Sequence, residues 1–140
     1  MMTAQEVKDL ASNYRAIADA LVDYRTAHPL ASDAERDMFN RTFGDIRKTA
    51  EDLMNQALQL AEVDVGTSVD GLKDATDKAA AAVKVVDTIT KAFSIAGAAI
   101  ELGATILHPT PGAVVGALDT LVQSIQKAAA KPAGAGGTAS

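Results

Sequence analysis

The two histidines, His28 and His108, are the residues best suited to bind a metal or to move protons near neutral pH. Each precedes a proline and stands between two expected helices. In an antiparallel bundle both turns would lie at the same end, so the histidines could approach each other. A metal site needs further ligands, however, and no Glu-x-x-His pair on a helix supplies them. We therefore interpret both as helix-terminal residues, where the helix dipole favours a positive charge.

Paired carboxylates and tyrosines are the other candidates for chemistry. Asp19 and Asp23 are one helical turn apart but lie off the apolar face, where water should leave them ionised. Tyr14 and Tyr24 lie on the apolar face and are interpreted as core residues with hydroxyls at the rim. Motifs for a serine nucleophile, a phosphate loop or a dinucleotide site are missing. The sequence therefore predicts a protein that is not an enzyme and holds no cofactor or metal.

Composition favours one all-α domain. The chain has 140 residues, of which 48% are hydrophobic but only 4% are aromatic, so alanine, leucine and valine must fill the core. Such small and aliphatic residues suit close packing of helices. The net charge of −5 and the lack of a basic stripe argue against nucleic acid as a partner. The absence of cysteine removes disulfides and thiolate chemistry.

Local signals divide the chain into four expected helices. A Thr-x-x-Glu capping box at Thr3 begins the first, and a second box at Ser32 follows Pro29. The glycine-containing stretch 64–71 and the tight segment 108–112 separate the later helices. We expect an antiparallel up-down-up-down four-helix bundle in a single domain, 1–130, with a long third and a short fourth helix. The expected helices are 3–28, 32–63, 69–107 and 111–130, followed by a disordered Ala/Gly-rich tail, 131–140.

The expected third helix is the element around which the chain is organised. Its inward residues recur at alternating spacings of three and four from Leu72 to Leu107 without a slip. Beyond Phe93 it becomes almost wholly apolar, with Glu101 as its only charge, so something must cover that end. The sequence leaves open whether this helix is straight or bends near Gly97.

The apolar hairpin 92–122 is the candidate interaction surface. Its residues could be ordinary core, could contact a protein partner or a second copy, or could contact lipid. We rank lipid last, because each arm is short and the chain is acidic. The candidate residues are Phe93, Ile95, Ile100, Leu102, Ile106, Leu107, Val114, Val115 and Leu118.

These observations predict a non-catalytic helical-bundle protein that acts through protein–protein interaction or self-association. The alternative is a protein active at membrane or lipid surfaces through the hairpin 92–122. The polar amino-terminal ten residues do not resemble a secretory signal, and no uncharged apolar stretch is long enough for a simple membrane span. The compartment is unknown from the sequence, which would fit a cytoplasmic protein or one exported without a cleaved leader.

Overall fold

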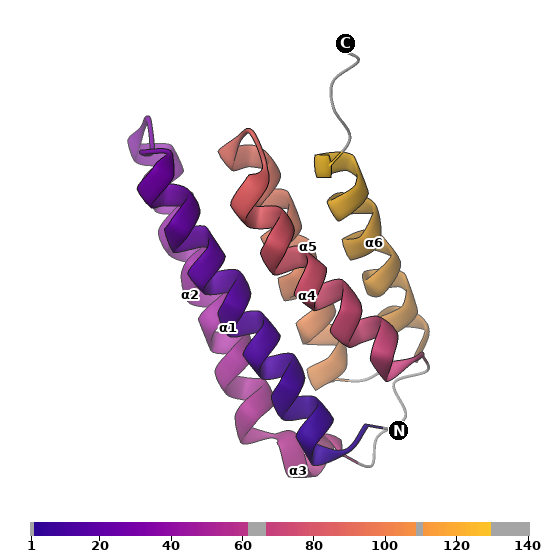
Figure 1. Cartoon of the computed structure of the whole chain (residues 1–140). Helices are drawn as coiled ribbons and strands as arrows, with labels where there is room; N and C mark the ends of the chain where they lie inside the picture. The colour runs from indigo at the N-terminus through magenta and orange to yellow at the C-terminus, as the bar shows by residue number, and fades with distance from the viewer. Residues whose placement is uncertain (1, 62–66, 109–110, 130–140) are drawn as a thin grey trace.

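The computed structural model describes residues 2–61, 67–108 and 111–129 (Figure 1). This part of the chain is all-helical and contains no strand, so the predicted all-α class is confirmed. The four-helix description is wrong, because five long helices and one short helix are present in these residues. They are α1 (Ala4–Ala27), α2 (Asp33–Asn55), α3 (Ala57–Leu60), α4 (Val69–Val85), α5 (Ile89–Leu107) and α6 (Pro111–Ala129). The expected tail 131–140 and the end of the second helix at 63 lie outside the described residues.

The long helices lie side by side along the molecule (Figure 1). Lys73 on α4 contacts Asp9 on α1 at 3.3 Å. Lys84 contacts Asp23 at 3.9 Å farther along both helices, so α1 and α4 run in the same direction. Short connections return the chain through α2 and α5, which run the opposite way, and α6 again follows the direction of α4 (Figure 1).

The expected third helix is two helices, and this is the main correction to the sequence analysis. The chain leaves the helix at Val86, where φ is −65° and ψ is 154°, and re-enters it after Thr88. The break therefore lies eleven residues before Gly97, the position where the sequence analysis had considered a bend. As a result α5 folds back along α4 and lies among the other helices (Figure 1).

Three residues with low helix propensity form this break, which explains why the chain turns there. The Thr88 hydroxyl accepts a hydrogen bond from the Lys91 backbone N–H at 3.3 Å and so caps α5. Asp87 pairs with Lys91 at 2.9 Å, and this contact holds the pKa of Asp87 below its usual range. Val86 remains buried in the turn. The spacing of three and four did not reveal that the helix is interrupted. Beyond the break it also marks residues that are only half-buried: Phe93, Ile100 and Leu107.

The second expected helix also ends early. α2 stops at Asn55, and Gln56 leads into the single turn α3. The kink keeps the next apolar residues inward, since Ala57 and Leu60 are both buried and α3 packs against α1. The buried apolar face of α2 therefore continues through residue 60 on two helices in place of the one that was expected.

Both predicted capping boxes are present, the second in altered form. The Thr3 hydroxyl accepts from Glu6 N–H at 3.1 Å, and the Glu6 carboxylate accepts from Thr3 N–H at 2.9 Å. At α2 the Ser32 hydroxyl accepts from Glu35 N–H at 3.2 Å, but the Glu35 carboxylate accepts from Ala31 N–H. Helix starts at 4 and 33 are therefore fixed by the residues that the sequence indicated.

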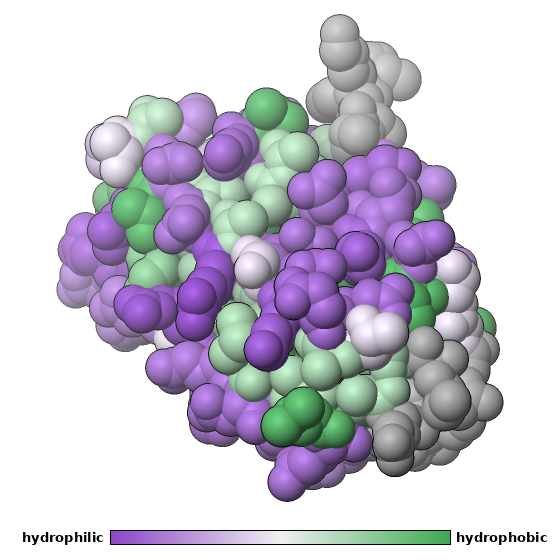
Figure 2. Space-filling model, turned by 60° about the horizontal axis from the view of Figure 1, so that its bottom comes forward, coloured by the Kyte–Doolittle hydropathy of each residue, from purple (hydrophilic) through white to green (hydrophobic). Residues whose placement is uncertain are grey.

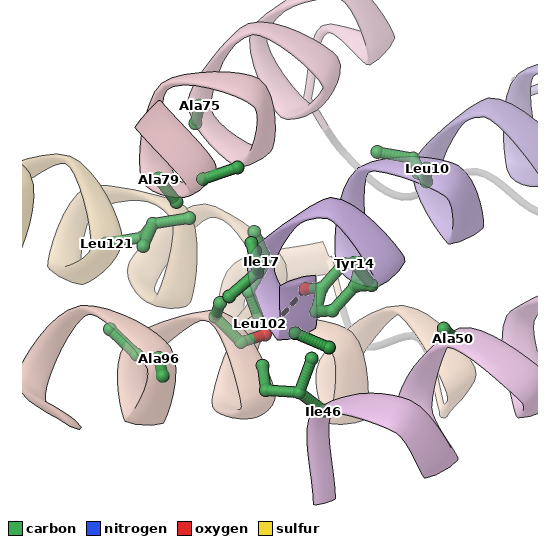
Figure 3. Close-up of a cluster of buried hydrophobic side chains, with 14 of the residues drawn as sticks. Leu10, Tyr14, Ile17, Ile46, Ala50, Ala75, Ala79, Ala96, Leu102 and Leu121 are labelled. Atoms are coloured by element: carbon green, nitrogen blue, oxygen red, sulfur yellow. Dashed lines mark hydrogen bonds between the residues drawn. The ribbon is translucent and has the colours of Figure 1, made fainter. Parts of the chain in front are cut away.

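All five long helices contribute to one core (Figure 3). Alanines on α4 and α5 let the helices approach closely, and leucines and isoleucines fill the remaining space. The core residues labelled in Figure 3 are Leu10, Tyr14 and Ile17 on α1, Ile46 and Ala50 on α2, Ala75 and Ala79 on α4, Ala96 and Leu102 on α5, and Leu121 on α6.

The cap at the break gives a first prediction. Thr88→Ala removes the side chain that accepts from Lys91 N–H and should lower the free energy of unfolding by about 1 kcal/mol. Thr90→Ala is the matched control, because Thr90 is exposed and caps nothing. Urea unfolding followed by circular dichroism measures both variants. Equal urea midpoints for the Thr88→Ala and Thr90→Ala variants would show that the Thr88 side chain does not stabilise the start of α5.

Candidate interaction surface

Four of the nine predicted interaction residues are fully buried in the core. Ile95, Leu102 and Ile106 are fully buried, although the sequence analysis named them as candidates for the interaction surface. α5 packs against four other helices: α1, α2, α4 and α6. The side chains of these three residues therefore contact other parts of the same chain. In the described fold they offer nothing to a partner, which corrects the expectation that they form an exposed surface.

The other six candidates differ in their exposure to solvent. Val114 is also fully buried, and Val115 is the one exposed member, at 46% of its maximal accessible area. The remaining four are half-buried against the core: Phe93, Ile100, Leu107 and Leu118.

A tyrosine from α1 holds α5 in place. The Tyr14 hydroxyl donates to the backbone carbonyl of Ala99 at 2.5 Å, a contact drawn in Figure 3. Tyr14 is fully buried, so its hydroxyl is inside the core and not at the rim as expected. A buried hydroxyl without a partner would be destabilising, and the Ala99 carbonyl supplies that partner. Burial raises the pKa of Tyr14 well above its ordinary value of 10.0.

Gly103 marks the closest approach of the helices around α5. A Cβ at this position would overlap Thr49 Cγ2 on α2 and would lie 3.2 Å from the Tyr14 hydroxyl oxygen on α1. Only glycine therefore fits between these two side chains. The sequence offers no signal for the two partners that require glycine at position 103.

The accessible apolar surface lies on α6, the helix at one side of the fold (Figure 1). α6 packs mainly against α4 and α5, and its residues Val114, Ala117 and Leu121 are buried there. We use the name α6 stripe for four residues that recur at spacings of three and four beside this buried face: Val115, Leu118, Val122 and Ile125. Sequence analysis named only Val115 and Leu118, although the same spacing also marks Val122 and Ile125.

Three residues of the α6 stripe line an open groove of about 330 Å³ between α4 and α6. The α4 side contributes the small residues Gly71 and Ala75, which leave room beside the branched side chains of α6. Asp74 and Lys78 stand at the rim and pair with each other at 2.9 Å. The groove is therefore apolar with a polar rim whose charges balance.

The rest of the accessible apolar surface is scattered. Figure 2 shows hydrophilic residues over most of one face, interrupted by small separate hydrophobic areas. The exposed large apolar residues other than Val115 lie on three different helices: Met38, Leu58 and Val85. Single exposed residues of this kind are normal on soluble folds and do not indicate a surface by themselves.

The histidines lie at opposite ends of the molecule, which corrects the expectation that they could approach each other. His28 caps the carboxyl end of α1 and stacks on Tyr24 with ring centroids 4.3 Å apart. His108 caps the carboxyl end of α5, which runs the other way (Figure 1). The break at Val86 causes this, because it adds one reversal of the chain. Among the described residues no three His, Asp or Glu side chains are placed to hold a metal.

Comparisons with known proteins add no function. The sequence matches no protein-family model, no curated protein and no solved structure. One helix of the described chain, α5, is long and apolar enough to cross a membrane. Buried helices of soluble folds share this property, and nearly half of α5 is buried here.

The buried tyrosine predicts a specific dependence on alkaline pH. In the unfolded chain Tyr14 ionises near pH 10, whereas in the folded chain its pKa is raised, so the folded state binds the extra proton. Stability should therefore fall as pH rises above 10, by about 1.4 kcal/mol per pH unit for this group.

Tyr14→Phe tests this dependence. At pH 7 the variant should be less stable than the wild type by about 1 kcal/mol, because the hydrogen bond to Ala99 is lost. At pH 11 that difference should shrink or reverse, since phenylalanine does not ionise. Urea unfolding at both values of pH measures it. A difference that does not change with pH would contradict the buried, neutral Tyr14.

Proposed function

We propose that this protein is a non-catalytic helical module that associates with a second copy of itself through the α6 stripe and the groove between α4 and α6. The observation that carries this proposal is the position of α6. α6 packs against α4 and α5 and carries an apolar stripe that is half-buried except at the exposed Val115. The residues of the stripe recur at the spacing found in pairs of packed helices.

The groove has the properties of a helix-binding surface. On the α4 side the groove is lined by the small residues Gly71 and Ala75, so another helix could approach the backbone of α4 closely. Its α6 wall is formed by Leu118, Val122 and Ile125, which would interdigitate with side chains at the same spacing. Grooves of this type bind amphipathic helices through residues at positions i, i+3 or i+4, and i+7.

A second copy is the occupant that the chain itself supports. α6 presents an apolar stripe with the required spacing, and Val115 is already exposed at its amino-terminal end. Two copies related by a two-fold axis would each offer the stripe and receive the other's, which is the self-complementary arrangement of most homodimers. The paired charges of Asp74 and Lys78 would not repel the approaching copy, because they neutralise each other.

Lipid is the second candidate occupant, and α5 is the observation that favours it. This helix meets the length and composition needed to cross a membrane. It would have to leave the core to do so, breaking the Tyr14–Ala99 hydrogen bond and exposing Ile95, Leu102 and Ile106. Self-association through α6 needs no such change and is therefore preferred.

Sedimentation of the wild-type chain from low micromolar to near-millimolar concentration tests the proposal. We expect a reversible shift from monomer to dimer. Val115→Glu introduces a charge into the stripe and should weaken the dimer at least about tenfold, because a buried unpaired charge is strongly disfavoured. Leu58→Glu is the control, since Leu58 is 82% exposed on α3 and should leave the dimer unchanged.

Two results would reject self-association through α6. One is a strictly monomeric wild type, and the other is an equal loss of dimer in the Val115 and Leu58 variants. A monomer that also floats with phosphatidylcholine vesicles would favour the lipid candidate in its place.

A further inference from the structure

The break between α4 and α5 has the properties of a hinge at which the chain can straighten. It consists of Val86, Asp87 and Thr88, and we call these three residues the hinge. Each has a low helix propensity, but none is a proline, which would prevent a helix from passing through. Straightening the hinge would join α4 and α5 into one continuous helix over 69–107.

Straightening satisfies backbone groups that the break leaves without helical partners. At every helix end the last carbonyl groups and the first N–H groups lack partners within the helix. At the hinge the Thr88 hydroxyl replaces one such partner, by accepting from Lys91 N–H at 3.3 Å. The ion pair between Asp87 and Lys91 adds little, because the Asp87 side chain is 58% exposed. Only a few local contacts therefore favour the folded-back hinge over the straight one.

The burial of α5 keeps a single copy from straightening. In a straight chain α5 would extend beyond α1 and α2, and fully buried side chains such as Ile95 and Leu102 would be exposed to water. A second copy can supply the missing cover. If two straight chains lie antiparallel, α5 and α6 of each pack on α1, α2 and α4 of the other. The contacts across the hinge are then made again between the copies, and such an exchange of identical elements is a low-cost route to a dimer.

The apolar pattern of the chain fits both forms. Partly or fully buried residues recur through the hinge at the spacings of three and four that one helix would need: Ala79, Ala82, Val86, Ile89, Phe93 and Ala96. Val85, directly before the hinge, is 81% exposed in the folded-back chain. In the exchanged dimer the two straight helices meet at the hinge, so Val85 of each copy lies near the two-fold axis. The exchange thus offers this exposed side chain an apolar neighbour.

We propose that two copies of this chain exchange α5 and α6 by straightening the hinge, so that each copy completes the helical core of the other. This exchange is separate from association through the α6 stripe, which joins two folded-back chains and leaves the hinge unchanged. Short hinge segments favour such exchange. Because α5 must leave the core first, the exchanged dimer should form and dissociate slowly, whereas association through the stripe should be rapid.

The distance between two labels on one chain distinguishes the straight form from the folded-back form. The chain has no cysteine, so Asp77→Cys on α4 and Glu101→Cys on α5 supply two unique labelling sites, both exposed. In a straight helix these positions, 24 residues apart, are separated by about 36 Å. In the folded-back chain the packing of α5 along α4 brings them within about 20 Å. Pulsed electron paramagnetic resonance measures this distance on spin-labelled chains diluted with an excess of unlabelled chain.

The wild type and a hinge variant give the first comparison. After refolding from urea at near-millimolar concentration, part of the wild type should show the long distance, and this part should grow with the chain concentration. Asp87→Ala combined with Thr88→Ala removes the cap and raises the helix propensity of the hinge. The ratio of straight to folded-back chains should therefore rise at least about tenfold. Absence of the long distance in both proteins would overturn the proposal.

Ile89→Pro should abolish the exchange. Residue 89 is the first of α5, where proline is favoured, and Thr88 has φ of −135° and ψ of 150°, which a following proline permits. The folded-back chain can therefore form, whereas proline inside a continuous helix breaks it. Ile89→Ala is the matched control, since it removes the same side chain but allows the straight helix. Equal long-distance fractions in the two variants would contradict a straightened hinge.

Val115→Glu separates this exchange from association through the α6 stripe. The variant should keep the long distance, because residue 115 lies on α6 and not in the hinge. A wild type that dimerises with only the short distance would retain the stripe dimer and reject the exchange. A long distance in a wild type that dimerises no better than Val115→Glu would retain the exchange and reject the stripe.

Discussion

Burial of α5 is the constraint on which the rest of this structure depends. Its apolar residues extend around most of the helix, so α1, α2, α4 and α6 must all lie against it. Two close contacts fix how they do so. Tyr14 reaches from α1 to the carbonyl of Ala99, and Gly103 allows Thr49 of α2 to approach the α5 backbone. Because four helices pack around α5, α6 lies at one side of the fold and part of its apolar surface stays accessible to solvent.

The break at Val86–Thr88 makes this burial possible. A continuous helix over 69–107 would carry the apolar residues beyond Phe93 away from α1 and α2, whereas the reversal returns them to the same layer (Figure 1). The sequence predicted the all-α class, the starts of α1, α2 and α4, and part of the inward face between Leu72 and Leu107. It did not predict the break, because Val86, Asp87 and Thr88 preserve the spacing of three and four while favouring a turn. Neither glycine nor proline marks the position.

The interaction surfaces were harder to predict for a related reason. Hydropathy identified the apolar hairpin correctly. Whether Ile95 or Leu118 is buried, however, depends on how many other helices surround the hairpin, and the residue pattern of one helix carries no information on that number. The error at 86–88 removed one helix from the count and so made the hairpin seem uncovered. The cation–π contacts between α1 and α2 were not predicted, because the arginines that make them lie off the apolar faces. Only the packing of α1 on α2 places Arg25 over Phe39.

Native-state hydrogen exchange tests the central position of α5 most directly. Exchange of the amides of residues 99–106, measured across low urea concentrations, reports the free energy needed to open this helix. If α5 is the buried centre, these amides should exchange only through global unfolding, with an opening free energy equal to that of the whole domain. Amides near the middle of α6 should open at lower free energy. Contradiction would come from α5 amides that open locally while those of α1 and α2 stay protected.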